Sequence, residues 1–267
     1  MRASDTIDRA ALVQRLGAVV REAGALALKS FRSPVRTWMK AGDSPVCEAD
    51  LAVDALLRER LDATAPGCAW LSEETEDDPA RLSSDRVWIV DPIDGTRAFL
   101  AGLDDWCISA ALAEGGRPVV AALYAPSTDD AYLATAGGGA THNGVPIAAT
   151  EGGSLEQARV AGPERRLARL APFGIVAQPK VHALALRIAR VAQGRLDMAL
   201  GGPNSNDWDL AAADLLVHEA GGALTTLAGE TLVYNRPKPK HTALLAAGRD
   251  RHRALSDLIR EGRVAFP

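Results

Sequence analysis

The sequence is organised around Val87-Trp88-Ile89-Val90-Asp91-Pro92-Ile93-Asp94-Gly95-Thr96-Arg97-Ala98-Phe99-Leu100, in which an apolar run ends in two aspartates, a glycine and a threonine. Residues 88–90 are β-branched and aromatic, which is typical of a strand buried on both faces. Pro92 disfavours a helical conformation at Asp91, so we expect Asp91 at the exit of this strand. A short helical pattern follows, and Asp94 is a suitable N-cap for it.

The polar end of this stretch indicates a site for a metal ion and a phosphate. Gly95 allows the backbone to approach a ligand closely, because no Cβ intervenes. A helix that begins at Gly95 or Thr96 would present free amides at the positive end of its dipole. Asp91 and Asp94 offer the oxygen ligands that Mg²⁺ prefers. The alternative is structural, since two aspartates at this spacing are commonly a helix cap and a solvated charge.

The composition is that of an ordinary globular protein. Its 267 residues are 47% hydrophobic and 24% charged, enough for a full core in one large domain or two small ones. The net charge of -4 and the scattered arginines argue against a nucleic-acid polymer as partner. Cys47, Cys68 and Cys107 form no CxxC pair, which argues against disulfides and zinc and fits a reducing cytoplasm.

No membrane partner is expected, and we predict a cytoplasmic protein. The N-terminus lacks the apolar segment of a signal peptide. No apolar run reaches the roughly 18 residues of a membrane span.

Helical and turn signals precede the central stretch. Apolar residues at helical spacing predict a helix over about 7–30, capped by Asp5 or Thr6. A short strand is expected over 35–40, followed by a turn-rich loop over 41–45 beside the site.

Two further carboxylates lie at the ends of predicted elements. Asp50 falls in the first turns of a second helix, where either pairing with the helix dipole or a catalytic role suits it. Glu73 directly follows a short strand over 69–71 and belongs to an acidic run, which is usually solvated surface. Its place after a strand is the same as that of Asp91, so we expect the two strand ends to converge.

The chain after this stretch has a second informative loop. Asp209 stands at the start of a helix over 210–220, where it would serve as a cap on structural grounds alone. His182 and His218 lie in helical patterns without a second ligand at metal spacing, so we predict that neither binds a metal. The other expected elements are antiparallel strands over 106–113, 119–124 and 131–135, strands over 195–200, 223–227 and 242–247, and helices over 181–192 and 251–260.

The pattern changes near residues 146–154, from a meander to alternating strands and helices. We therefore predict an N-terminal α+β domain, residues 1–148, which carries most of the metal ligands. A C-terminal α/β domain, residues 149–267, would contribute Asp209.

These motifs resemble the inositol monophosphatase family, which are Mg²⁺-dependent phosphomonoesterases that include the 3'(2'),5'-bisphosphate nucleotidases. The resemblance covers nearly the whole chain, with SEE at 72–74, DPIDGT at 91–96 and WD at 208–209, followed by a small-residue helix and Ala-Gly-Gly. It implies an α/β fold, a layered α/β/α/β/α sandwich of the type found in fructose-1,6-bisphosphatase. Relatives are commonly dimers, so a homodimer is a further expectation.

The resemblance also implies roles for individual residues. Asp50, Glu73 and Thr96 would activate the attacking water, and the backbone at Gly95 and Thr96 would cradle the phosphate, with substrate contacts also at Ile93, Asp94 and Asp209. The implied ligands of two or three Mg²⁺ ions are Glu73, Asp91, the Ile93 carbonyl, Asp94 and Asp209. Independently, two carboxylates 4 Å apart repel by roughly 4 kcal/mol at an effective dielectric constant near 20, so such a cluster requires cations.

Two departures from the family pattern concern the site. Cys47 stands where the family often has threonine, which is expected to weaken one hydrogen bond near the attacking water. Residues 178–180, Gln-Pro-Lys, replace the Gly-Ser pair that commonly precedes the next helix.

The expected activity is hydrolysis of a small phosphorylated metabolite. DGTRAF at 94–99, Tyr-Ala-Pro at 124–126 and Gly-Pro-Asn at 202–204 look closer to the bisphosphate nucleotidase branch, so a 3'(2'),5'-bisphosphate nucleotide is the leading substrate. Inositol monophosphate, or another sugar or polyol phosphate, is the alternative, and the family implies inhibition by Li⁺. Two other classes stay open, namely a catalytically silent metal-binding relative and a structural interaction protein.

Overall fold

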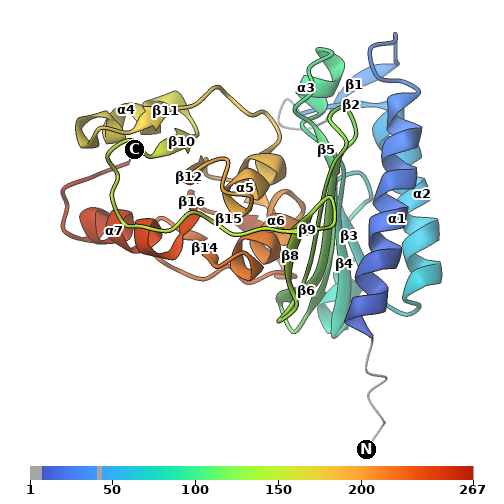
Figure 1. Ribbon diagram of the computed structural model, residues 1–267. Helices are drawn as coiled ribbons and strands as arrows, with labels where there is room; N and C mark the ends of the chain where they lie inside the picture. Colours follow the sequence, from blue (N-terminus) through green and yellow to red (C-terminus); the bar gives the residue numbers. More distant parts are fainter. Residues whose placement is uncertain (1–7, 41–43, 267) are drawn as a thin grey trace, which may run out of the picture.

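The computed structural model describes residues 8–40 and 44–266, which form alternating layers of helices and sheets (Figure 1). A helical pair covers one face of a seven-stranded sheet, and a second pair lies between that sheet and a five-stranded one. Two more helices pack on the outer side of the second sheet. The predicted α/β/α/β/α sandwich is therefore confirmed. In layer order the helices are α1 (Arg9–Leu28) and α2 (Glu48–Thr64), then α5 (Leu184–Ala192) and α6 (Asp207–Glu219), then α4 (Glu164–Leu170) and α7 (Arg249–Arg260).

The larger sheet has the strand order β3-β4-β5-β6-β7-β8-β9. Only its first pair, β3 and β4, is parallel, and the others are antiparallel, as the predicted meander requires. Its strands are β3 (Ala69–Ser72), β4 (Arg86–Asp94), β5 (Cys107–Glu114), β6 (Arg117–Ala125), β7 (Asp130–Thr135), β8 (Gly139–His142) and β9 (Val145–Pro146).

The smaller sheet is mixed and has the order β11-β10-β12-β16-β14. Its strands are β10 (Arg159–Ala161), β11 (Val176–Ala177), β12 (Met198–Gly201), β14 (Gly222–Thr226) and β16 (Leu244–Gly248). Two short ribbons complete the fold, β1 (Thr37–Lys40) with β2 (Ser44–Cys47), and β13 (Ser205–Asn206) with β15 (Lys240–His241).

The start of the chain differs from the prediction in two details. Helix α1 begins at Arg9, and Asp8 caps it by accepting a hydrogen bond from the Ala11 amide at 3.1 Å; the predicted caps lie outside the described residues. Ser44 and Pro45 belong to β2 and not to a loop, because each strand of a two-stranded ribbon has one unpaired edge, which tolerates the missing N–H of proline. The rest of the predicted loop, residues 41–43, lies outside the described residues.

The central stretch ends differently from the prediction. Strand β4 does not stop at Asp91 but continues to Asp94, with a register shift between these two residues. Pro92 cannot donate to the ladder, and a bulge accommodates it. Asp94 is consequently not the N-cap of the helix that follows it. Gly95 caps the short helix α3 (Thr96–Leu100) at φ +93°, a conformation that favours glycine.

The two predicted domains share apolar packing. One core cluster combines residues of β4 to β7 with residues of α5, α6 and β16, so it draws on both sides of residue 148. The boundary at residue 148 stays a prediction. In the described part of the chain no helix is both long and apolar enough to cross a bilayer.

The unfolding free energy of the protein is expected to depend on pH through His218, which lies on α6. Its Nδ1 lies 2.9 Å from a carboxylate oxygen of buried Asp214, and this contact raises the pKa of His218 above its usual value, against the opposing effects of burial and Arg117. A raised pKa in the folded state stabilises the protein below about pH 6.5, and this contribution is lost as pH rises through the folded-state pKa. His218→Gln should flatten the fall in unfolding free energy above pH 6.5, measured by urea titration. An unchanged slope would contradict the assignment.

Candidate active site

Four acidic side chains line a cavity of about 310 Å³ beside the end of β4. They come from the loop after β3, from β4 and from the first turn of α6. The complete lining is Pro45, Glu73, Asp91, Asp94, Gly95, Thr96, Arg97, Lys180, His182 and Asp209. The acidic side chains of this one cavity therefore come from elements that lie more than 100 residues apart in the sequence.

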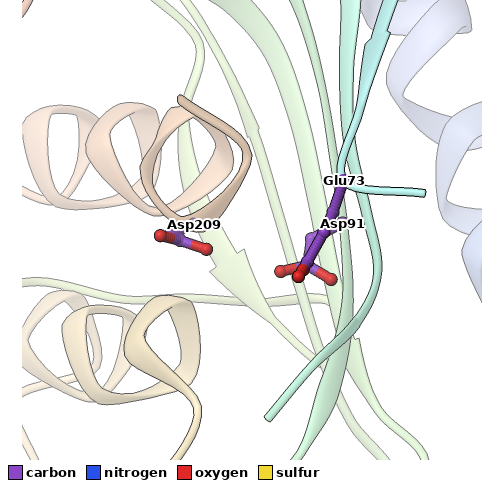
Figure 2. Close-up of side chains that lie close together, drawn as sticks. All are labelled: Glu73, Asp91 and Asp209. Atoms are coloured by element: carbon purple, nitrogen blue, oxygen red, sulfur yellow. The ribbon is translucent and has the colours of Figure 1, made fainter. Parts of the chain in front are cut away.

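Three of these carboxylates converge on one point. Figure 2 shows Glu73 and Asp91 pointing from neighbouring strand ends toward Asp209, and one oxygen from each lies within 4.8 Å of the others. The parallel pairing of β3 with β4 sets Glu73 beside Asp91, and the Glu73 amide donates to the Val90 carbonyl at 3.3 Å. The expected convergence of Glu73 and Asp91 is confirmed, although Asp91 lies three residues before the end of β4.

Asp209 reaches this cluster from the first turn of α6. The helix starts three residues earlier than predicted, so Asp209 is not the cap itself. Asn206 is the N-cap, and the Asp209 carboxylate accepts its amide at 2.7 Å in a capping box. The carboxylate of Asp209 therefore has a structural role at the start of α6, and its role as a metal ligand stays a prediction.

The cluster is electrostatically unfavourable without a cation. Burial raises the pKa of Asp91 well above its usual value, and repulsion from Glu73 and Asp94 adds to the effect. Burial and Asp94 likewise raise the pKa of Asp209. Carboxylate oxygens that are gathered, buried and mutually repelling suit a hard divalent cation such as Mg²⁺. The donor set thus fits the predicted metal.

Asp94 has a different position from the one predicted. Its carboxylate accepts hydrogen bonds from the amides of Leu184 at 3.2 Å and Ala185 at 2.6 Å, so it caps α5 from another element. Burial raises the pKa of Asp94 to about 7, although these amides oppose the shift. Asp94 lines the cavity but is not among the three converging carboxylates, and its role as a metal ligand stays a prediction.

Asp50, Cys47 and Thr96 form a buried network behind the cavity. The Thr96 hydroxyl lies 3.1 Å from Asp50 Oδ1 and also 3.1 Å from the Ile93 carbonyl oxygen, the two acceptors between which its proton is shared. The amide and the thiol of Cys47 both donate to Asp50 Oδ2 at 2.8 Å. Burial raises the pKa of Cys47 to about 12, which keeps the thiol protonated as a donor. Cysteine thus retains the geometry of the hydrogen bond that we expected to be weakened.

Lys40 and His182, like Arg97 and Lys180 in the cavity lining, were not predicted as site residues from sequence. Lys40 Nζ lies 3.1 Å from Glu73 Oε1 and 2.8 Å from Glu74 Oε1, so it offsets part of the negative charge. His182 lines the cavity, and its Nδ1 is held 2.7 Å from Asp105 Oδ2. The sequence around each residue does not indicate a role at the site, since Lys40 lies in a short ribbon and His182 precedes a helix. Only the fold brings them to the acidic cavity.

Known proteins resemble the chain over most of its length. A family profile described as the inositol monophosphatase family matches residues 5–261. An inositol monophosphatase of Dictyostelium discoideum is 33% identical over 226 residues, 79% of this chain and 83% of the relative. A histidinol-phosphatase of Mycobacterium tuberculosis is 34% identical over 77% of this chain and 80% of its own length. A 3'-phosphoadenosine 5'-phosphate phosphatase of Mycobacterium bovis is 36% identical over 71% of this chain and 72% of its own length.

A solved structure shares the fold. The extragenic suppressor protein suhB from Bartonella henselae superposes with a TM-score of 0.84 at 25% identity, covering 94% of this chain and 99% of that one.

Proposed function

The chain belongs to the inositol monophosphatase family, and from this premise we propose how its acidic cavity hydrolyses a small phosphate ester. It is a phosphoric monoester hydrolase of a metal-dependent family. The observation that carries the proposal is the convergence of Glu73, Asp91 and Asp209 within 4.8 Å in a cavity that Thr96 also lines.

The cavity supplies the ligands for the metal. In this proposal Glu73, Asp91 and Asp209 hold Mg²⁺, with Asp94 and the Ile93 carbonyl as further ligands and two or three ions per site. When bound, such ions neutralise phosphate oxygens and acidify a coordinated water. Lys40, the last residue of β1, forms an ion pair with Glu73. A cation that binds Glu73 therefore competes with this ion pair.

The Asp50–Thr96 pair orients the attacking water. Thr96 Oγ1 accepts a hydrogen bond from the water and directs its own proton to Asp50 Oδ1, 3.1 Å away. Burial raises the pKa of Asp50 above its usual value, which makes this carboxylate a stronger base. Glu73 takes part in deprotonating the water, and the backbone at Gly95 and Thr96 holds the phosphoryl group beside the metal ligands.

The leading substrate is a 3'(2'),5'-bisphosphate nucleotide. It is supported by the sequence motifs noted above and by the relative named for 3'-phosphoadenosine 5'-phosphate. Inositol monophosphate, or another sugar or polyol phosphate, is the second candidate, favoured by the Dictyostelium relative. Inhibition by Li⁺ and a homodimeric state stay predictions of the family resemblance, and a cytoplasmic location stays a prediction from the composition of the sequence.

Phosphate release tests the proposal. Purified protein should release inorganic phosphate from adenosine 3',5'-bisphosphate when Mg²⁺ is present, and chelation by EDTA should abolish turnover. Parallel assays with inositol 1-phosphate rank the two candidates by kcat/KM. Absence of turnover with either substrate would remove the substrate proposal, and turnover that survives chelation would remove the metal.

A further inference from the structure

Beside the acidic cavity lies a second cavity of opposite charge, with a volume of about 340 Å³. Lys180 lines both cavities, so the two adjoin each other at this residue. The lining of the second cavity is Arg159, Gln178, Pro179, Lys180, Val181, Arg190, Arg195 and Leu196. We propose that this cavity, called here the cationic pocket, binds a second phosphate of the substrate. The inference rests on the proposed function, since it assigns the other end of the same ligand.

Three of the four cations in the cationic pocket are not neutralised. Arg159 is neutralised, because its guanidinium lies 2.9 Å from the carboxylate of Asp197. Within residues 8–40 and 44–266, the side chains of Lys180, Arg190 and Arg195 have neither an ion pair nor a hydrogen bond. An acidic protein with a formal net charge of -4 thus concentrates free positive charge at one place.

Arg190 has a buried donor that no group in the described part of the chain satisfies. Its Nε is buried and has no hydrogen-bond partner in the described structure. A buried N–H that belongs to a charged group and lacks an acceptor is unfavourable, and such groups are usually satisfied by a partner. Arginine and lysine together are the donors that recognise phosphate, arginine through its planar fork and lysine as a point charge.

Helix α5 connects the two cavities. Asp94, from the acidic cavity, caps its first turn through the amides of Leu184 and Ala185, and Arg190 lies in its last turn. Arg190 follows Leu184 by six positions on this helix, which is about 9 Å at a rise of about 1.5 Å per residue. A nucleoside that carries phosphates at two positions can bridge a separation of this size.

The cationic pocket separates the substrates that the relatives' names suggest. A bisphosphate nucleotide supplies one phosphate to the acidic cavity and a second to the free cations. Inositol monophosphate has no second anion for Arg190 and Lys180. Histidinol phosphate carries an ammonium group, which these side chains repel. Lys180 belongs to residues 178–180, where the chain departs from the family pattern. This segment therefore contributes to specificity for a substrate with two phosphates.

Two nucleotides that differ by one phosphate test this directly. The variants Lys180→Met and Arg190→Met keep side-chain length but remove the charge, and Arg253→Met on α7 removes a remote exposed charge as a control. For each protein, kcat and KM are measured with adenosine 3',5'-bisphosphate and with adenosine 3'-monophosphate. Thermal melting identifies any variant that fails to fold.

The wild type should prefer the bisphosphate, and each pocket variant should raise KM for it by about 10-fold. Arg190→Met, which lies outside the acidic cavity, should leave KM for the monophosphate and both kcat values unchanged. The control should match the wild type. If the wild type has the same KM for the two nucleotides, or if the variants raise KM equally for both, the proposal of a cationic pocket is overturned. The phosphatase proposal then remains intact. If neither nucleotide is hydrolysed, the substrate proposal fails; equal equilibrium affinities for the two would then overturn the pocket as well.

Discussion

Asp91→Asn is expected to lower kcat by about 10³-fold, because it removes one of the three carboxylates that converge in the acidic cavity. Loss of a cation that stabilises transition-state charge is worth several kcal/mol, and each 1.36 kcal/mol corresponds to a factor of ten in rate. The substitution is nearly isosteric. Its amide oxygen can still accept the hydrogen bond that Asp91 Oδ1 receives from the Ile93 amide at 3.1 Å, so the bulge in β4 should be preserved.

The same substitution should stabilise the metal-free protein. Asp91 is 1% exposed and is repelled by Glu73, Asp94 and Asp209, so removing its charge relieves an unfavourable interaction. We expect the unfolding free energy in EDTA to rise by about 1 kcal/mol. Saturating Mg²⁺ should stabilise the wild type by about 2.7 kcal/mol at 100 times its dissociation constant, and the variant much less.

Asp85→Asn is the matched control. Asp85 precedes the opposite end of β4, is exposed, and has no side-chain hydrogen bond or ion pair within the described structure. This variant should keep wild-type activity and the wild-type response to Mg²⁺, both measured by phosphate release and thermal melting. If Asp91→Asn retained activity and the melting shift with Mg²⁺, the acidic cluster would not be the metal site.

Asp94→Asn should affect both stability and activity. The carboxylate accepts two amides at the start of α5, and an asparagine offers only one oxygen for them. Loss of half the cap should lower the unfolding free energy by about 1 kcal/mol. Because Asp94 also lines the acidic cavity as a proposed metal ligand, we expect kcat to fall by about 10²-fold or more.

A second cap variant separates the two effects. Asp8→Ala removes the cap of α1, where Asp8 accepts the Ala11 amide at 3.1 Å, and should lower stability by a similar amount. Helix α1 covers the outer face of the larger sheet, so activity should remain that of the wild type. Full phosphatase activity in folded Asp94→Asn would exclude Asp94 from the site, whatever its effect on melting.

Local pattern was sufficient for most elements and for the identity of the acidic residues. The apolar run at 87–90 is a buried strand, and the small-residue helix after Trp208 is α6. The wrong predictions concern segments whose backbone conformation depends on pairing with other strands. Strand β4 extends through Pro92 because β5 pairs with it on both sides of a bulge, and no local preference of an Asp-Pro sequence announces that pairing.

The capping roles show the same division. A carboxylate such as Asp94 or Asp209 is recognisable as a cap from its own neighbours, but the helix that it caps need not follow it in sequence. Asp94 caps α5, about 90 residues away, and Asp209 completes a capping box around Asn206. The Asp209 contact is local, but hydrophobic periodicity cannot reveal the Asp94 contact, because tertiary packing supplies its partner amides.

By itself, the sequence determined most helices and strands and the residue types of the acidic cluster, since burial patterns and turn residues are properties of neighbouring positions, and the resemblance of its motifs to a known family implied the layered fold. Only the tertiary structure decided that Glu73, Asp91 and Asp209 share one point, that Lys40 reaches Glu73, and that Lys180 lies between two cavities of opposite charge. The physical reason is that electrostatic interaction depends on distance in space, which the packing of α5 and α6 against the larger sheet sets and which sequence separation does not encode.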